Sequence, residues 1–96
     1  MLFEWDDAKN ASNLSKHGIS FDEAIAIFEG PTLTKRSDGD FGEARSISFG
    51  RLGISIVVAV IHTDRSGITR VISARKAKDK ERTLFHAYLI AAIGPD

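Results

Sequence analysis

The side chains best suited to chemistry in this chain are arginines and lysines, and most of them gather where a strand-like segment passes into a helix-like one. The basic candidates are Arg45, Arg51, Arg70, Arg75, Lys76, Lys78, Lys80 and Arg82. A guanidinium binds two phosphate oxygens at once and stays charged at any physiological pH. Because neighbouring strands lie about 5 Å apart, cations from adjacent strands can reach one phosphodiester. The pattern predicts a phosphate-binding surface, unless these side chains only pair with acids or extend over apolar neighbours.

Other classes of site find little support in the residue pattern. The three histidines, at positions 17, 62 and 86, lack metal-ligand spacing, so no metal site is expected. The stretches GDFG and GRLG have neither the spacing nor the context of a phosphate-binding glycine loop. No serine lies in a nucleophile elbow. We therefore expect no cofactor, and arginine and lysine chemistry is what remains.

Charge is divided unevenly along the chain, although the net charge is zero. Residues 1–43 carry four basic against nine acidic side chains, whereas residues 44–96 carry nine basic against four acidic. This asymmetry indicates a polyanion partner for the basic part, provided that folding leaves its cations on one surface. The alternative is an ordinary solvated basic face.

Length and composition indicate one folded domain, residues 1–96. The apolar fraction of 43% and the charged fraction of 27% are ordinary for a globular protein. No cysteine is present, which excludes disulfides and thiolate sites. The most apolar stretch, residues 54–61, is too short to span a bilayer, and the N-terminus is acidic where a signal peptide is basic. We expect a cytoplasmic protein with no membrane partner.

Two helices are predicted in the first third of the chain, after a short strand at LFEW. Asp6 is suited to cap a helix over residues 7–17, which Gly18 ends. Ser20 and Glu23 have capping-box spacing and open a second helix that runs to about Glu29.

Four strands and a last helix are predicted in the remainder. TLTKRS, EARSISFG, ISIVVAVIH and ITRVISAR read as strands, and the apolar residues on both faces of the third indicate a central strand covered on both sides. After Arg75, apolar residues recur at helical spacing up to Gly94. The order β-α-α-β-β-β-β-α predicts an α+β domain in which helices pack on an antiparallel meander.

Two motifs carry a resemblance to a known family. FEWDDAKNASNLSKHGISFDEA, followed some fifty residues later by VISARKAKDKER, resembles the BrnT family of toxins from bacterial type II toxin–antitoxin modules. The first motif rests on Trp5, Asp6, Lys9, Asn13, Lys16, His17, Gly18, Phe21 and Ala24. The second rests on Ile72, Ser73, Ala74, Arg75, Lys76, Ala77 and Glu81. Together they bracket nearly the whole chain.

The resemblance implies a RelE-like fold and a metal-independent endoribonuclease that inhibits translation. It also implies neutralisation by a ribbon-helix-helix antitoxin of the BrnA type, in a heterotetramer or a larger complex. One departure concerns Lys78, which stands where the family usually has the Ser or Thr of a capping box with Glu81. We expect a weakened helix start, or an additional cation that serves RNA.

Metal-free RNA cleavage uses the 2′-hydroxyl as an internal nucleophile, so it needs a base, cations for the phosphorane and an acid. As a hypothesis, Arg75 and Lys76 stabilise the transition state. Glu81 or His62 acts as base, although a structural histidine at the end of a strand is the favoured interpretation of His62. The remaining roles are flanking-phosphate contacts from Arg70 and Arg45 and RNA binding by Arg51, Lys78, Lys80 and Arg82.

The polar residues of the first motif have mainly a structural interpretation. Lys9, Asn13 and His17 recur at four-residue steps and form one polar helical face, which is suited to contact an antitoxin or RNA. His17 itself is interpreted as a cation at a helix terminus.

Two rival functions stay open at this level. One is a non-catalytic nucleic-acid-binding module, although no recognition helix or aromatic stacking platform is visible. The other is an inactivated toxin retained to bind its antitoxin, which Lys78 favours.

Overall fold

The computed structural model describes residues 1–37 and 44–93. Its elements are β1 (Leu2–Glu4), α1 (Asp7–His17), α2 (Phe21–Ala24), the 3₁₀ helix η1 (Ile25–Glu29), β2 (Leu33–Ser37), β3 (Arg45–Leu52), β4 (Ile56–Arg65), β5 (Ile68–Lys76) and α3 (Asp79–Ile93). This order confirms the predicted α+β class and the predicted succession of elements.

The five strands form one mixed sheet in the order β1-β5-β4-β3-β2. Strands β2 to β5 make the expected antiparallel meander. β1, however, pairs in parallel with β5, along Ile68 to Arg70 only. The prediction of an antiparallel sheet therefore holds for the meander and not for β1. A strand of three residues has too little pattern to specify its partner or direction.

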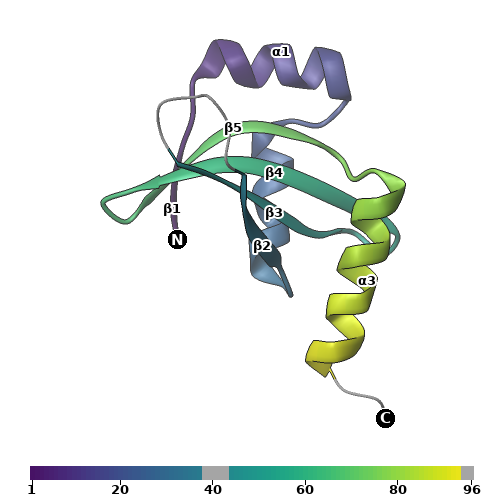
Figure 1. The fold of residues 1–96 in the computed structure, drawn as a ribbon. Coiled ribbons are helices and arrows are strands. Elements are labelled where there is room, and N and C mark those ends of the chain that lie inside the picture. The colour runs from purple at the N-terminus through teal and green to yellow at the C-terminus, as the bar shows by residue number, and fades with distance from the viewer. Residues whose placement is uncertain (38–43, 94–96) are drawn as a thin grey trace.

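Helices cover both faces of the sheet, as the apolar pattern of β4 predicted. On one face, Phe21 of α2 and Ile27 of η1 pack with Val58 and Val60 of β4. On the other face, α3 covers the sheet through a second cluster, made of Ile47, Phe49, Val57, Ala59, Phe85 and Leu89. Figure 1 shows α1 lying across the β5 side of the sheet, while α3 begins at the far end of β5 and its C-terminal part extends past the strands.

The helix boundaries follow from local chemistry. The Asp6 carboxylate accepts a hydrogen bond from the Lys9 amide at 3.0 Å, and Gly18 takes the left-handed conformation, with φ 73°, that ends α1. Ser20 and Glu23 form the predicted capping box.

The second predicted helix is split into α2 and η1 instead of running unbroken to Glu29. η1 lies so close to β3 that a Cβ atom on Gly50 would stand 2.6 Å from Cβ of Ile27. This contact between distant segments is absent from the local sequence pattern, and it accompanies the tighter 3₁₀ winding.

Beyond Arg70, β1 no longer covers β5, so the outer edge of β5 needs another partner. The side chain of Asn13 in α1 supplies it. Its Nδ2 donates to the carbonyl oxygen of Ala74 at 2.8 Å, and its Oδ1 accepts from the Ala74 amide at 3.2 Å. α1 is thereby fixed against the strand edge. Among the described residues, no helix is long and apolar enough to cross a membrane.

Candidate functional site

Arg75 and Glu81 form a bidentate ion pair at the junction of β5 and α3. Arg75 Nη1 donates to Glu81 Oε1 at 2.7 Å, and Nη2 donates to Oε2 at 3.0 Å. The two side chains are only 23% and 18% exposed. The pair brings the end of the strand and the first turn of the helix together, so it determines how α3 leaves the sheet.

Glu81 also caps α3 although Lys78 replaces the usual hydroxyl residue. The backbone amide of Lys78 donates to Glu81 Oε1 at 2.8 Å. This is the half of a capping box that the glutamate makes, and Arg75 holds the same carboxylate in place. The expected weakening of the helix start is therefore offset by the ion pair.

The same contacts favour the ionised form of the Glu81 carboxylate. Hydrogen bonding from Arg75, aided by the Lys78 amide, lowers the pKa of Glu81, and the carboxylate in turn raises the pKa of Arg75. A carboxylate with a lowered pKa and two oxygens already engaged is a weak proton acceptor. A structural role is the one that this geometry favours for Glu81.

Arg75 and Lys76 leave β5 on opposite faces of the sheet. Arg75 pairs with Ala59, which packs under α3, whereas Lys76 pairs with Val58, which belongs to the opposite core. Lys76 is exposed and lines a shallow cavity of about 190 Å³ together with Arg82. The two adjacent cations therefore do not converge from one face.

The other predicted cations are spread over the molecule. Arg70 pairs with Glu4 of β1 at 2.7 Å, on the face that carries α3. Arg45 precedes Ile47 by two residues on β3 and so shares that face. The remaining members lie at exposed positions: Arg51 near the end of β3, Lys78 and Lys80 at the start of α3, and Arg82, which pairs with Asp79.

His62 belongs to a buried polar chain that crosses the sheet. It is 3% exposed, its Nε2 lies 2.7 Å from Ser48 Oγ, and its Nδ1 lies 3.3 Å from Asp64 Oδ1. Thr69 donates to the same Asp64 oxygen at 3.0 Å. The ring also meets Phe28 edge-on. These contacts favour the structural interpretation, since a substrate has no direct path to the imidazole.

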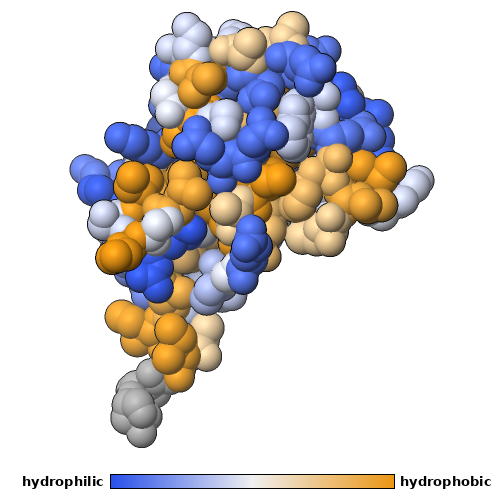
Figure 2. Space-filling model, turned by 180° about the vertical axis from the view of Figure 1, so that it is seen from behind, coloured by the Kyte–Doolittle hydropathy of each residue, from blue (hydrophilic) through white to orange (hydrophobic). Residues whose placement is uncertain are grey.

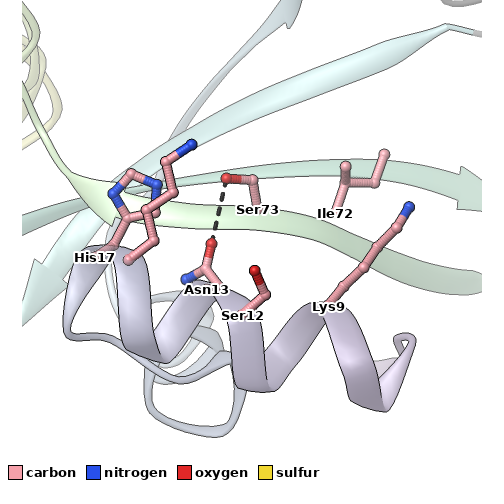
Figure 3. Close-up of a pocket in the computed structure, with 7 residues that line it drawn as sticks. Lys9, Ser12, Asn13, His17, Ile72 and Ser73 are labelled. Atoms are coloured by element: carbon pink, nitrogen blue, oxygen red, sulfur yellow. Dashed lines mark hydrogen bonds between the residues drawn. The ribbon is translucent and has the colours of Figure 1, made fainter.

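A different set of polar residues meets in a groove between α1 and β5, which we call the α1–β5 groove. Its volume is about 170 Å³, and it is lined by Lys9, Ser12, Asn13, Lys16, His17, Ile72 and Ser73. Figure 3 shows Lys9 and His17 at opposite ends, Ser12 and Asn13 between them, and Ser73 facing Asn13 from the strand. The groove thus unites the two motifs that were separate in the sequence.

The α1–β5 groove was missed as a site because the first motif was interpreted mainly as structural. A signal was present: residues 9, 12, 13, 16 and 17 follow the i, i+3, i+4, i+7, i+8 pattern of a core-facing stripe, yet every one is polar.

Among the described residues, no group of three or more His, Cys, Asp or Glu side chains is placed to hold a metal.

These features define a small α+β domain with a five-stranded mixed sheet, a cationic groove beside its edge and an arginine-anchored C-terminal helix. Residues 5–81 match the family model described as the ribonuclease toxin BrnT of type II toxin–antitoxin systems. The chain belongs to this family. It is therefore a toxin component with RNA as substrate and an antitoxin as partner.

A solved structure agrees with this assignment. The structure is similar to the crystal structure of the Brucella abortus ribonuclease toxin BrnT, with a TM-score of 0.61 and 27% sequence identity. The match covers 82% of this chain and 100% of the Brucella chain. A search of curated proteins finds no match.

Proposed function

We propose that this toxin is an endoribonuclease that cleaves RNA without a metal ion, by attack of the 2′-hydroxyl on the adjacent phosphodiester, and thereby inhibits translation. The observation that carries the proposal is the family match over residues 5–81, because that range contains both the α1–β5 groove and the β5–α3 junction. The products of such a reaction are a 2′,3′-cyclic phosphate and a 5′-hydroxyl.

Arg75 is the proposed cation for the transition state. Glu81 engages one side of its guanidinium and so fixes its direction, which lowers the entropy cost of binding phosphate through the remaining N–H groups. Because Lys76 leaves the strand on the other face, it is not placed to share a phosphate with Arg75 and is proposed to attract the RNA backbone. Arg70 and Arg45, on the same face as Arg75, are proposed to hold flanking phosphates.

The exposed cations are proposed to attract the RNA backbone. Lys78 and Lys80, with Arg82 and Arg51, lie near or beyond the junction and are accessible to solvent. Contacts of this kind raise affinity without reading sequence, and they weaken as salt increases.

An inactivated toxin was the main rival function. Lys78 was the feature that favoured it, because a missing cap would disturb the first turn of α3. Glu81 still caps that turn and remains paired with Arg75, so this reason for inactivity loses its force.

The proposed partner is a ribbon-helix-helix antitoxin of the BrnA type, in a heterotetramer or larger complex in the cytoplasm. Support comes from α3, where Leu84, Ile90 and Ile93 are 44%, 66% and 73% exposed. Figure 2 shows hydrophobic side chains gathered along this tapering end of the molecule. An apolar helical surface of this kind is suited to a protein interface.

The test is cleavage of mixed RNA by the purified full-length chain in excess EDTA, followed by analysis of the fragment ends. We expect fragments that end in 2′,3′-cyclic phosphate. Cleavage that disappears in EDTA and returns with Mg²⁺, or fragments with 3′-hydroxyl ends, would overturn the proposed mechanism.

Two variants separate the roles of the ion pair. Arg75→Ala should cut the cleavage rate by roughly 100-fold, the scale seen when one transition-state donor is lost. Glu81→Gln breaks the same ion pair but keeps the guanidinium, so its cleavage rate should fall by much less than that of Arg75→Ala. Equal losses in the two variants would show that Arg75 acts only by holding the junction together.

A further inference from the structure

We propose that the α1–β5 groove binds the reacting phosphodiester and that His17 is a catalytic residue that accepts the proton of the 2′-hydroxyl. This inference rests on the proposed ribonuclease function and supplies the base that Glu81 and His62 are poorly placed to provide. Lys9 and Lys16 are the proposed cations that neutralise the phosphate within the groove.

The charge of the groove is the first argument. Its lining includes two cations (Lys9 and Lys16) and the imidazole of His17, and among the described residues no carboxylate lines it. The described residues give none of these three an acidic partner. Like charges that share a concave surface repel one another and concentrate a positive potential, so an anion is the ligand that relieves the repulsion.

The construction of α1 is the second argument. The positions that face β5 would normally be apolar, because burial of an apolar stripe is what attaches a helix to a sheet. Here the attachment is made by Asn13, which is 8% exposed and also donates to the carbonyl oxygen of Ile19 at 2.9 Å. The helix dipole favours Lys16 and His17 in the last turn of α1, but it does not account for Lys9 near the opposite end. The bonds of Asn13 do, however, hold those cations on a rigid wall.

The ends of the groove suit a displacement at phosphorus. The attacking and leaving oxygens lie on opposite sides of the phosphorus atom, and Figure 3 places His17 and Lys9 at opposite ends. Their positions differ by eight in the helix, a rise of about 12 Å. Ser12 offers a hydroxyl donor in the middle, whereas the Ser73 hydroxyl donates to Asn13 Oδ1 at 3.5 Å.

The proton steps balance as follows. The 2′-hydroxyl gives its proton to the His17 imidazole and forms the new bond to phosphorus, while the bond to the 5′-oxygen breaks. That oxygen takes a proton from water, and the imidazolium returns its own proton to solvent. Imidazole is suited to this because it gains and loses a proton near neutral pH. Among the described residues that line the groove, the other titratable groups are Lys9 and Lys16 of α1, and β5 contributes Ile72 and Ser73.

Arg75 lies on the same face of β5 as Ser73, although it does not line the α1–β5 groove. Ser73 pairs with Ile61 and Arg75 with Ala59, so the side chains of Ser73 and Arg75 share one face of β5, about 7 Å apart along the strand. The transition-state role of Arg75 is therefore compatible with a phosphate bound beside Ser73.

The experiment separates binding from chemistry. A 2′-deoxy oligonucleotide lacks the nucleophile, so it measures binding alone, while RNA in EDTA reports cleavage. His17→Ala should reduce cleavage by at least about 100-fold. His17→Asn, which has a similar polar character, guards against a loss of folding. Both variants should bind the 2′-deoxy oligonucleotide within about twofold of the parent. Lys9→Met and Lys16→Met should weaken that binding and reduce its salt dependence by about 0.7 per variant.

His86→Ala is the matched control, because His86 is an exposed histidine of α3 outside the groove. It should leave both cleavage and binding unchanged. If the parent chain cleaves RNA and the folded groove variants cleave equally well, the inference fails while the proposed function stands. If these variants lose only antitoxin binding, the groove is a protein interface and the inference also fails. If the parent chain itself does not cleave RNA, the proposed function fails instead.

Discussion

Replacing Glu81 by glutamine tests the central structural contact of the β5–α3 junction. Glutamine has nearly the same shape and still accepts a hydrogen bond from the Lys78 amide, because either Glu or Gln completes a capping box. The substitution therefore removes the charge of the Arg75 pair and one of its two hydrogen bonds, because an amide has a single acceptor oxygen. Since both side chains are about four-fifths buried, the loss should exceed that of an exposed ion pair.

The magnitude follows from the two hydrogen bonds. Bonds to charged groups contribute about 1.5–3 kcal/mol each, and glutamine keeps part of this, so we expect a loss of roughly 2 kcal/mol in the free energy of unfolding. A chain of 96 residues has an unfolding entropy near 0.2 kcal/mol/K, which converts the loss to a decrease of about 10 °C in Tm. Circular dichroism during thermal unfolding at neutral pH measures it.

The pH dependence gives an independent check. Because Arg75 lowers the pKa of Glu81 in the folded state, the stabilisation is present above the ordinary glutamate pKa and is lost as the pH falls from about 5 through the lowered value. The difference in Tm between the parent chain and Glu81→Gln should therefore shrink in acid.

The control is Asp79→Asn, which breaks the exposed pair with Arg82 in the same turn of α3. It should change the free energy of unfolding by less than about 1 kcal/mol. Equal decreases in Tm for Glu81→Gln and Asp79→Asn, or a Glu81→Gln effect that does not diminish in acid, would refute the reasoning about burial and charge.

Three further outcomes follow from the structure. Asn13→Ala should lower the free energy of unfolding by roughly 3 kcal/mol, measured in urea, because the Ala74 amide and carbonyl lose their partner; a change below that of Asp79→Asn would contradict this. Gly50→Ala should lower the free energy of unfolding by about 1–3 kcal/mol, since the new Cβ would overlap Ile27. An unchanged Tm would show that η1 moves to make room for it. Lys80→Ala should reduce the salt dependence of RNA binding by about 0.7, and an unchanged slope would remove Lys80 from the RNA surface.

The order of elements was accessible from the sequence because its signals are local. Asp6, Gly18 and the Ser20–Glu23 pair act on backbone groups within one turn, so their effect is the same in any fold. The alternation of polar and apolar residues along β3, and the apolar residues on both faces of β4, likewise indicated which side chains are buried. The family motifs were also accessible, because they are defined by the order and spacing of residues in the chain.

The arrangement of the candidate site was less accessible, because adjacency in the sequence does not determine direction in space. Arg75 and Lys76 are neighbours in the chain, yet strand geometry sends them to opposite faces. His62 was one of two candidate bases, and its position between Ser48 and Phe28 favours the structural interpretation. The side-chain partner of Glu81 was sought at position 78 and is Arg75 instead, across the turn, while Lys78 contributes its backbone amide.

The sequence by itself determined the succession of helices and strands, the caps, the apolar faces and the family of this protein, all of which depend on residues close together in the chain or on their order. Only the tertiary structure decided that β1 joins β5 in parallel, that Arg75 is held by Glu81, and that the two motifs meet in the α1–β5 groove. Asn13 and Ala74 are 61 residues apart, and their hydrogen bonds exist only after the sheet has closed against α1, because no local pattern encodes which strand edge remains uncovered.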